Sequence, residues 1–238
     1  MFGRFLIELL KWSEVWALLI PLSVLLIRRS SPALLLQIPI YLGLAFLLNL
    51  CITLVANVPA FTHLFHDSNH IFYNLHSVAK VVFFGWFIQR YLPPASANIV
   101  KLIFIFYGAF VFLNFTLFEN PLVFSSRLLT VESILLLFLG ITWYLYTIQD
   151  DELRDFKKEI VFLVITGLTI YEGVCFFIFL VYKQLIVPEQ QFAILIWKVH
   201  DVAFIILNLF LARACMKASV LPAGKLFSRF AHFSPLQD

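Results

Sequence analysis

Seven long apolar segments, separated by short polar connections, make up most of the chain. They cover approximately residues 9–27, 33–56, 71–89, 99–118, 128–148, 160–182 and 192–215. An α-helix needs about 20 apolar residues to cross the hydrocarbon of a bilayer, whereas a barrel strand needs only about 10 that alternate with polar ones. A helix also satisfies its backbone hydrogen bonds within its own segment, as a lipid environment requires. The pattern predicts an all-α, polytopic integral membrane bundle of seven transmembrane helices.

The connections between these segments are short, so no second domain is expected between them. They contain the helix-breaking residues Pro32, Pro93, Pro94, Pro121 and Pro188. The first segment has a basic start, as a secretory signal does. Because Glu8 and Glu14 interrupt it and no small-residue cleavage site precedes Arg28, we expect it to be a retained first helix.

Composition supports a lipid environment. Of the 238 residues, 62% are hydrophobic and 13% are charged, against about 25% charged residues in soluble domains. Residues 1–216 are predicted to form the transmembrane domain and residues 217–238 a short cytoplasmic tail that is amphipathic and interfacial. Such a tail is too short for a kinase or DNA-binding domain, so the expected partner is the lipid bilayer, with no nucleic acid bound.

The distribution of Lys and Arg predicts the orientation. With the N-terminus outside, the cytoplasmic segments hold eleven of these residues, and the opposite side holds only Arg4, Lys11, Arg127 and Lys183. Positively charged short loops are retained on the cytoplasmic side. The chain is therefore predicted to be a multi-pass protein of the cytoplasmic (inner) membrane with its N-terminus out and its C-terminus in.

Several ionisable residues lie inside the predicted spans, where each costs about 2.5–3.5 kcal/mol on insertion scales. The candidates are His76, Lys80, Glu132, Glu172, Lys198, His200 and Asp201. In the predicted orientation most of them lie in the outer half of the bundle, although they come from distant parts of the chain. The simplest arrangement is an outward-opening polar pocket that binds a ligand. Structural ion pairs that only fix helix packing are the alternative.

Helical spacing places some of these residues on common faces. Tyr73, His76 and Lys80 share one face of the third helix, and Trp197, Asp201 and Asn208 share one face of the seventh. Lys80 and Lys198 each require an anionic partner, which the carboxylates in the other spans could provide.

The second connection contains His63, His66 and His70. If residues 59–70 are helical, the three histidines project to one side, and the last two have an i, i+4 spacing that can bind a divalent metal. A zinc site or a pH sensor is one hypothesis. Interfacial histidines in contact with water are the alternative. The cysteines Cys51, Cys175 and Cys215 have neither metal-ligand nor disulfide spacing and are interpreted as buried small side chains.

In the fourth connection, Arg127 is expected to pair with Glu119 or Glu132 and close a lid over the pocket. The alternative is a capped helix start, with Ser125 or Ser126 as the cap.

Two seven-helix families provide comparisons. In rhodopsins the retinal lysine is at mid-helix, with a carboxylate counterion on the third helix. Here Lys198 is near the outer end of its helix and the third helix offers Lys80, which argues against retinal. Ceramidase and adiponectin-receptor hydrolases need a histidine pair in the seventh helix, where this chain has only His200.

The segments Glu119-Asn120-Pro121, Phe124 to Arg127, Glu132-Ser133 and Trp197 to Asn208 resemble those of small uncharacterised bacterial seven-transmembrane proteins. Members of that group resemble the membrane sensor halves of histidine-kinase systems. The resemblance implies signalling through a separate partner, such as a histidine kinase.

The function expected from the sequence is a membrane sensor or receptor-like module, in which a ligand in the outward pocket shifts the helices and a separate partner receives the signal. A metal-dependent membrane hydrolase using His63, His66, His70 and His200 is one alternative, and a small-solute or ion transporter is another. No catalytic residue is assigned and no cofactor is required, with zinc the one metal considered.

Overall fold

The computed structural model describes residues 9–28, 37–65, 68–148, 156–186 and 190–218, and all regular secondary structure within these ranges is helical, with no strand. The elements are α2 (Ser13–Arg28), α3 (Gln37–Asn57), α4 (Pro59–Leu64), α5 (His70–Gln89), α6 (Pro94–Leu113), the short π-helix η2 (Asn114–Phe118), α7 (Ser126–Ile148), α8 (Phe156–Ile186) and α9 (Gln190–Ala218). The described residues end at Ala218, so the predicted tail lies outside them from residue 219 onward.

In the part of the chain that the structure describes, six helices are long and apolar enough to cross a membrane: Gln37–Asn57, His70–Gln89, Asn98–Phe118, Ser126–Ile148, Glu159–Tyr182 and Ile194–Ala218. This agrees with the predicted helical bundle, and the chain is a multi-pass membrane protein. Helix α2 is apolar but has only 16 residues, which gives it a length of about 24 Å against about 30 Å for a hydrocarbon core. A seventh span therefore stays a prediction.

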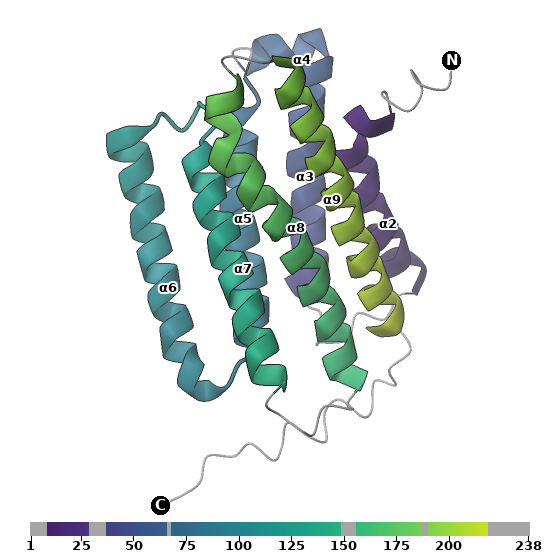
Figure 1. The fold of residues 1–238 in the computed structure, drawn as a ribbon. Coiled ribbons are helices and arrows are strands. Elements are labelled where there is room, and N and C mark those ends of the chain that lie inside the picture. Colours follow the sequence, from purple (N-terminus) through teal and green to yellow (C-terminus); the bar gives the residue numbers. More distant parts are fainter. Residues whose placement is uncertain (1–8, 29–36, 66–67, 149–155, 187–189, 219–238) are drawn as a thin grey trace, which may run out of the picture.

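Six of the helices form a closed ring. Contacts run from α2 to α3, then to α5, α7, α8 and α9, and from α9 back to α2 (Figure 1). Helix α6 stands outside this ring against α5. Only 17% of its apolar window is buried, against 39–50% for the other five long helices. The interior of the molecule is therefore the space within the six-helix ring.

Close approach of neighbouring ring helices depends on glycine. A Cβ atom at Gly167 of α8 would lie 2.6 Å from the Cβ of Phe210 on α9, and one at Gly140 of α7 would lie 2.5 Å from the Oγ1 of Thr169 on α8. Small residues let membrane helices pack backbone to backbone in this way.

The ring interior is divided into an apolar half and a polar half. Buried apolar side chains fill the half that contains the C-terminal ends of α5, α7 and α9: Phe84, Phe87, Leu136, Leu139, Trp143, Leu207 and Leu211. The buried ionisable residues lie in the other half, which contains α4 and the N-terminal ends of α2 and α9. The buried ionisable groups are therefore confined to one half of the bundle, whereas the other half holds uncharged buried amides such as Gln37 and Asn208.

The connection between α6 and α7 is fixed over the start of α5 at this polar end. Asn74 donates hydrogen bonds from Nδ2 to the carbonyls of Pro121 and Val123, both at 2.9 Å, and its Oδ1 accepts one from the Ser125 N–H. Ser125 then caps α7, since its Oγ accepts a hydrogen bond from the Leu128 N–H at 3.2 Å. This confirms the predicted cap.

Candidate functional site

A cleft of about 600 Å³ opens at the polar end of the ring. It lies between the N-terminal parts of α2, α5 and α9 and the C-terminal parts of α3 and α8. Its lining comprises Leu10, Lys11, Glu14, Ile52, Thr53, Ala56, Asn57, Asn69, Tyr73, Tyr182, Ile194, Trp197, Lys198 and Asp201. Its size is that of a small-molecule site.

Aromatic rings form one wall of the cleft. The ring centroid of Trp197 lies 5.5 Å from that of Tyr73 and 5.6 Å from that of Tyr182. Phe124 of the α6–α7 connection packs against two of these rings. Its ring centroid lies 5.0 Å from that of Tyr182 and 5.9 Å from that of Tyr73. Such rings present apolar edges and faces together with the Tyr hydroxyls.

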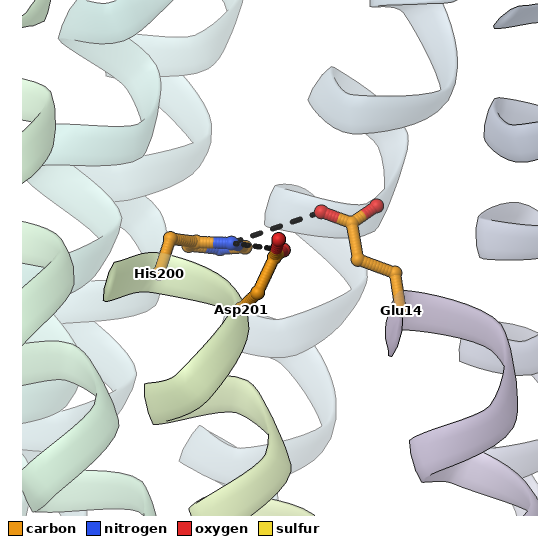
Figure 2. Close-up of side chains that lie close together, drawn as sticks. All are labelled: Glu14, His200 and Asp201. Atoms are coloured by element: carbon orange, nitrogen blue, oxygen red, sulfur yellow. Dashed lines mark ion pairs between the residues drawn. The ribbon is translucent and has the colours of Figure 1, made fainter. Parts of the chain in front are cut away.

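Glu14, His200 and Asp201 meet at the floor of the cleft, where α2 faces α9 (Figure 2). The Nδ1 atom of His200 lies 3.7 Å from Oε1 of Glu14 and 3.7 Å from Oδ1 of Asp201. All three residues are buried, with 5–6% of their surface exposed. The other oxygen of Glu14 accepts a hydrogen bond from the Tyr73 hydroxyl at 3.2 Å.

Lys80 forms a second charged cluster deeper in the ring. Its Nζ lies 2.5 Å from Oε1 of Glu132 on α7 and 3.2 Å from Oε1 of Glu172 on α8. Neither carboxylate is exposed. Lys80 thus joins α5 to α7 and α8 by ion pairs. This agrees with the prediction that Lys80 needs an anionic partner.

Tyr171 connects the two clusters. Its hydroxyl is hydrogen-bonded to Nε2 of His200 at 2.9 Å, and Nζ of Lys80 lies 4.6 Å from the centre of its ring. His76 lies at the same level, hydrogen-bonded through Nε2 to the Tyr41 hydroxyl at 3.2 Å. These groups surround a cavity of about 20 Å³, which is room for one water molecule. A continuous series of polar groups therefore runs from the cleft floor to Lys80.

The buried charges in this region do not balance. Among the described residues, four buried carboxylates (Glu14, Glu132, Glu172 and Asp201) accompany a single buried ammonium, that of Lys80. Net charge in a low-dielectric interior is costly unless it is paired. The site therefore favours protons or additional cations.

The sequence-predicted site residues fall into three groups in the structure. His76, Lys80, Glu132 and His200 line the small cavity, and Glu172 pairs with Lys80. Asp201 and Lys198 line the cleft. Lys198 is half-buried, and an anionic partner for it stays a prediction.

Glu14 and Tyr171 belong to the site but were not among its predicted residues. Glu14 is an acidic residue in an apolar segment, as Glu132 and Glu172 are. The same reasoning from the sequence could therefore have identified it. Tyr171 carries no such signal, because a tyrosine in a membrane helix is common at apolar and interfacial positions.

The predicted histidine cluster does not form on one helix. His63 is exposed on α4, which ends at Leu64, whereas His70 begins α5, so the condition of a continuous helix over residues 59–70 is not met. His66 lies outside the described residues. Arg127 faces Glu119, with 3.9 Å between Nε and Oε1, and Glu132 pairs with Lys80 instead.

Searches of family models, of curated protein sequences and of solved structures find no match to this chain.

Proposed function

We propose that the protein is a receptor-type membrane sensor. It would cross the cytoplasmic (inner) membrane seven times, with its N-terminus outside and its C-terminus in the cytoplasm. In this topology α2 is the first span, and the positively charged connections are cytoplasmic. The cleft lies at the end of the bundle where α2 begins. It therefore opens to the outside.

The observation that carries the proposal is the series of contacts from the cleft floor to the centre of the ring. Glu14 and Asp201 line the cleft, His200 contacts both of them, and Tyr171 links His200 to Lys80. Because Lys80 holds α5, α7 and α8 together, a ligand that changes the charge balance at the floor alters the packing of those helices. A ligand shifts such an equilibrium only by its differential affinity for the two arrangements.

The floor of the cleft favours a solute that carries a positive charge, although Lys11 and Lys198 also line the cleft. Two carboxylates lie at the floor, and the rings of Tyr73, Tyr182 and Trp197 line the cleft above them. Aromatic faces attract cations, and quaternary ammonium groups are bound in this way in proteins. Such a group would also reduce the excess of buried negative charge.

The apolar half of the ring is the reason to prefer a sensor to the alternative of a transporter. The side chains of Phe84, Leu136, Leu139 and Leu207 are fully buried there. A transported solute would have to displace this packing, whereas a sensed solute would remain at the cleft. The signal would then pass to a separate partner at the cytoplasmic end, such as the histidine kinase that the sequence resemblance implies.

The experiment measures whether a cation in the cleft moves the far end of the bundle. Ile27 of α2 and Ile148 of α7 lie at the opposite end and are 80% and 74% exposed. Spin labels on Ile27→Cys and Ile148→Cys, in a variant without the three native cysteines and reconstituted in nanodiscs, report the distance between them. With tetramethylammonium, choline or Zn²⁺ as probes, at least one should shift the distribution by about 2 Å.

The control is the double variant Glu14→Gln/Asp201→Asn in the same labelled background, in which the shift should disappear. An unchanged distribution with all three probes would contradict the sensor proposal, as would a shift of equal size in the double variant.

A further inference from the structure

We infer that Glu14, His200 and Asp201 form a binding site for a divalent transition-metal ion at the floor of the cleft. This inference rests on the proposed function and names a ligand class for the same cleft. It differs from the predicted zinc site, which used the histidines of the second connection.

The three side chains have the separation of ligands around one ion. Each offers one ligand atom, and these atoms lie within 4.8 Å of one another, with the imidazole nitrogen 3.7 Å from an oxygen of each carboxylate. Ligands bound to zinc at about 2.0–2.2 Å in tetrahedral geometry are about 3.4 Å apart. Small side-chain rotations would bring the three atoms to that distance.

The atoms that would bind the ion have no hydrogen-bond partner. Nδ1 of His200 and Oε1 of Glu14 are both buried and unsatisfied, although each residue is more than nine-tenths buried. At 3.7 Å the contacts between them are too long for hydrogen bonds. A buried polar atom without a partner is costly, and a bound cation would satisfy both atoms at once.

The surrounding groups orient the ligands as in known metal sites. When Nε2 of His200 donates its hydrogen to the Tyr171 hydroxyl, Nδ1 carries a lone pair directed at the two carboxylates. The Tyr73 hydroxyl fixes the other oxygen of Glu14. Hydrogen bonds of this kind set the tautomer and the orientation of metal ligands.

Charge and ligand type together indicate the class of ion. A divalent cation would offset two of the excess buried negative charges, and it would have access from the cleft. One imidazole nitrogen with two carboxylate oxygens suits Zn²⁺, Co²⁺ or Mn²⁺ better than Mg²⁺ or Ca²⁺, which prefer oxygen ligands alone. Three protein ligands would leave a coordination position open toward the cleft.

The test is titration of Zn²⁺ into the purified full chain in nanodiscs after treatment with a chelator. We expect one ion per chain, and an affinity at least 100-fold lower in each of the variants Glu14→Gln, Asp201→Asn and His200→Gln. The control is the variant His63→Ala/His70→Ala, because both histidines lie outside the trio. It should change the affinity less than threefold.

A second measurement uses the unaltered chain and so does not depend on the folding of a variant. Cu²⁺ bound at this site should show coupling to one imidazole in pulsed electron paramagnetic resonance. Absence of stoichiometric Zn²⁺ binding, a signal from several imidazoles, or loss of binding only in the His63→Ala/His70→Ala variant would overturn the inference.

Zn²⁺ binding without a change in the Ile27–Ile148 distance, together with no response to either ammonium probe, would preserve the metal site and refute the sensor. A shift with tetramethylammonium in a chain that binds no Zn²⁺ would preserve the sensor and refute the metal site.

Discussion

At the scale of single residues, Lys80 has the largest structural role in the polar half. Its ammonium group is the one buried cation in the described part of the chain, and it faces two carboxylates that are themselves inaccessible to solvent. Removing one member of a buried charge pair leaves the other charge uncompensated, which costs about 3–5 kcal/mol. The ion pairs therefore constrain how α5, α7 and α8 pack together, and in the proposed sensor they would also pass on the change at the cleft floor.

Lys80→Met should accordingly lower the free energy of unfolding by about 3–5 kcal/mol, measured by thermal or denaturant unfolding in detergent. Lys101→Met is the control, because Lys101 is exposed on the peripheral helix α6, and it should change stability by less than about 0.5 kcal/mol. The triple variant Lys80→Met/Glu132→Gln/Glu172→Gln should recover much of the loss, since it removes the unpaired charges. Equal destabilisation by Lys80→Met and Lys101→Met would contradict this account.

The sequence predicted this residue-scale picture in part. Lys80, Glu132, Glu172, His200 and Asp201 could be identified because ionisable residues in apolar segments are rare and need partners. Which carboxylate pairs with which cation could not be predicted, because that depends on the neighbours of each helix in the ring.

At the scale of elements, the apolar pattern identified the long helices to within a few residues but not their positions. Helix α6 has a mean hydropathy of 2.0 and α8 one of 2.1, yet 17% of one window and 50% of the other are buried. In a soluble protein a peripheral helix would show a polar face. In a membrane the outer face contacts lipid and is also apolar, so the sequence contains little information about which helix is peripheral.

The packing of α8 against α9 should be sensitive to the size of residue 167. Gly167→Ala places a Cβ 2.6 Å from that of Phe210, and overpacking of this kind costs about 1–3 kcal/mol. Gly173→Ala on the same helix is the matched control, since no atom lies within 4 Å of its added Cβ. Unfolding of both variants should show a lower melting temperature for Gly167→Ala only. A similar decrease for both would mean that helix contact is not the cause.

The α6–α7 connection should loosen when Asn74 is replaced. Asn74→Ala removes three hydrogen bonds to that connection and leaves the buried N–H of Ser125 unsatisfied, at a cost of about 1–3 kcal/mol. Hydrogen exchange of residues 119–125 should become faster. The control is Asn57→Ala, because Asn57 is exposed and donates to the Thr53 carbonyl of its own helix. Unchanged exchange in Asn74→Ala would show that the connection is held by other contacts.

At the scale of the whole molecule, the ring brings together residues that are far apart in the chain. Glu14 meets His200 and Asp201 because α2 closes the ring against α9, a contact that the order of the segments does not reveal. The predicted convergence of charged residues in one half of the bundle agrees with the structure, and the orientation of that half toward the outside remains a prediction. The sensor proposal depends on that orientation, whereas the metal site depends only on the contact of α2 with α9.

The most direct test is the accessibility of the cleft to a membrane-impermeant thiol reagent in intact cells. Ala56→Cys lines the cleft and Arg213→Cys is exposed near the other end of the bundle, each in a background without Cys51, Cys175 and Cys215. We predict that Ala56→Cys reacts from the outside and that Arg213→Cys reacts only in inverted vesicles. Reaction of Ala56→Cys from the cytoplasmic side alone would contradict an outward-opening site.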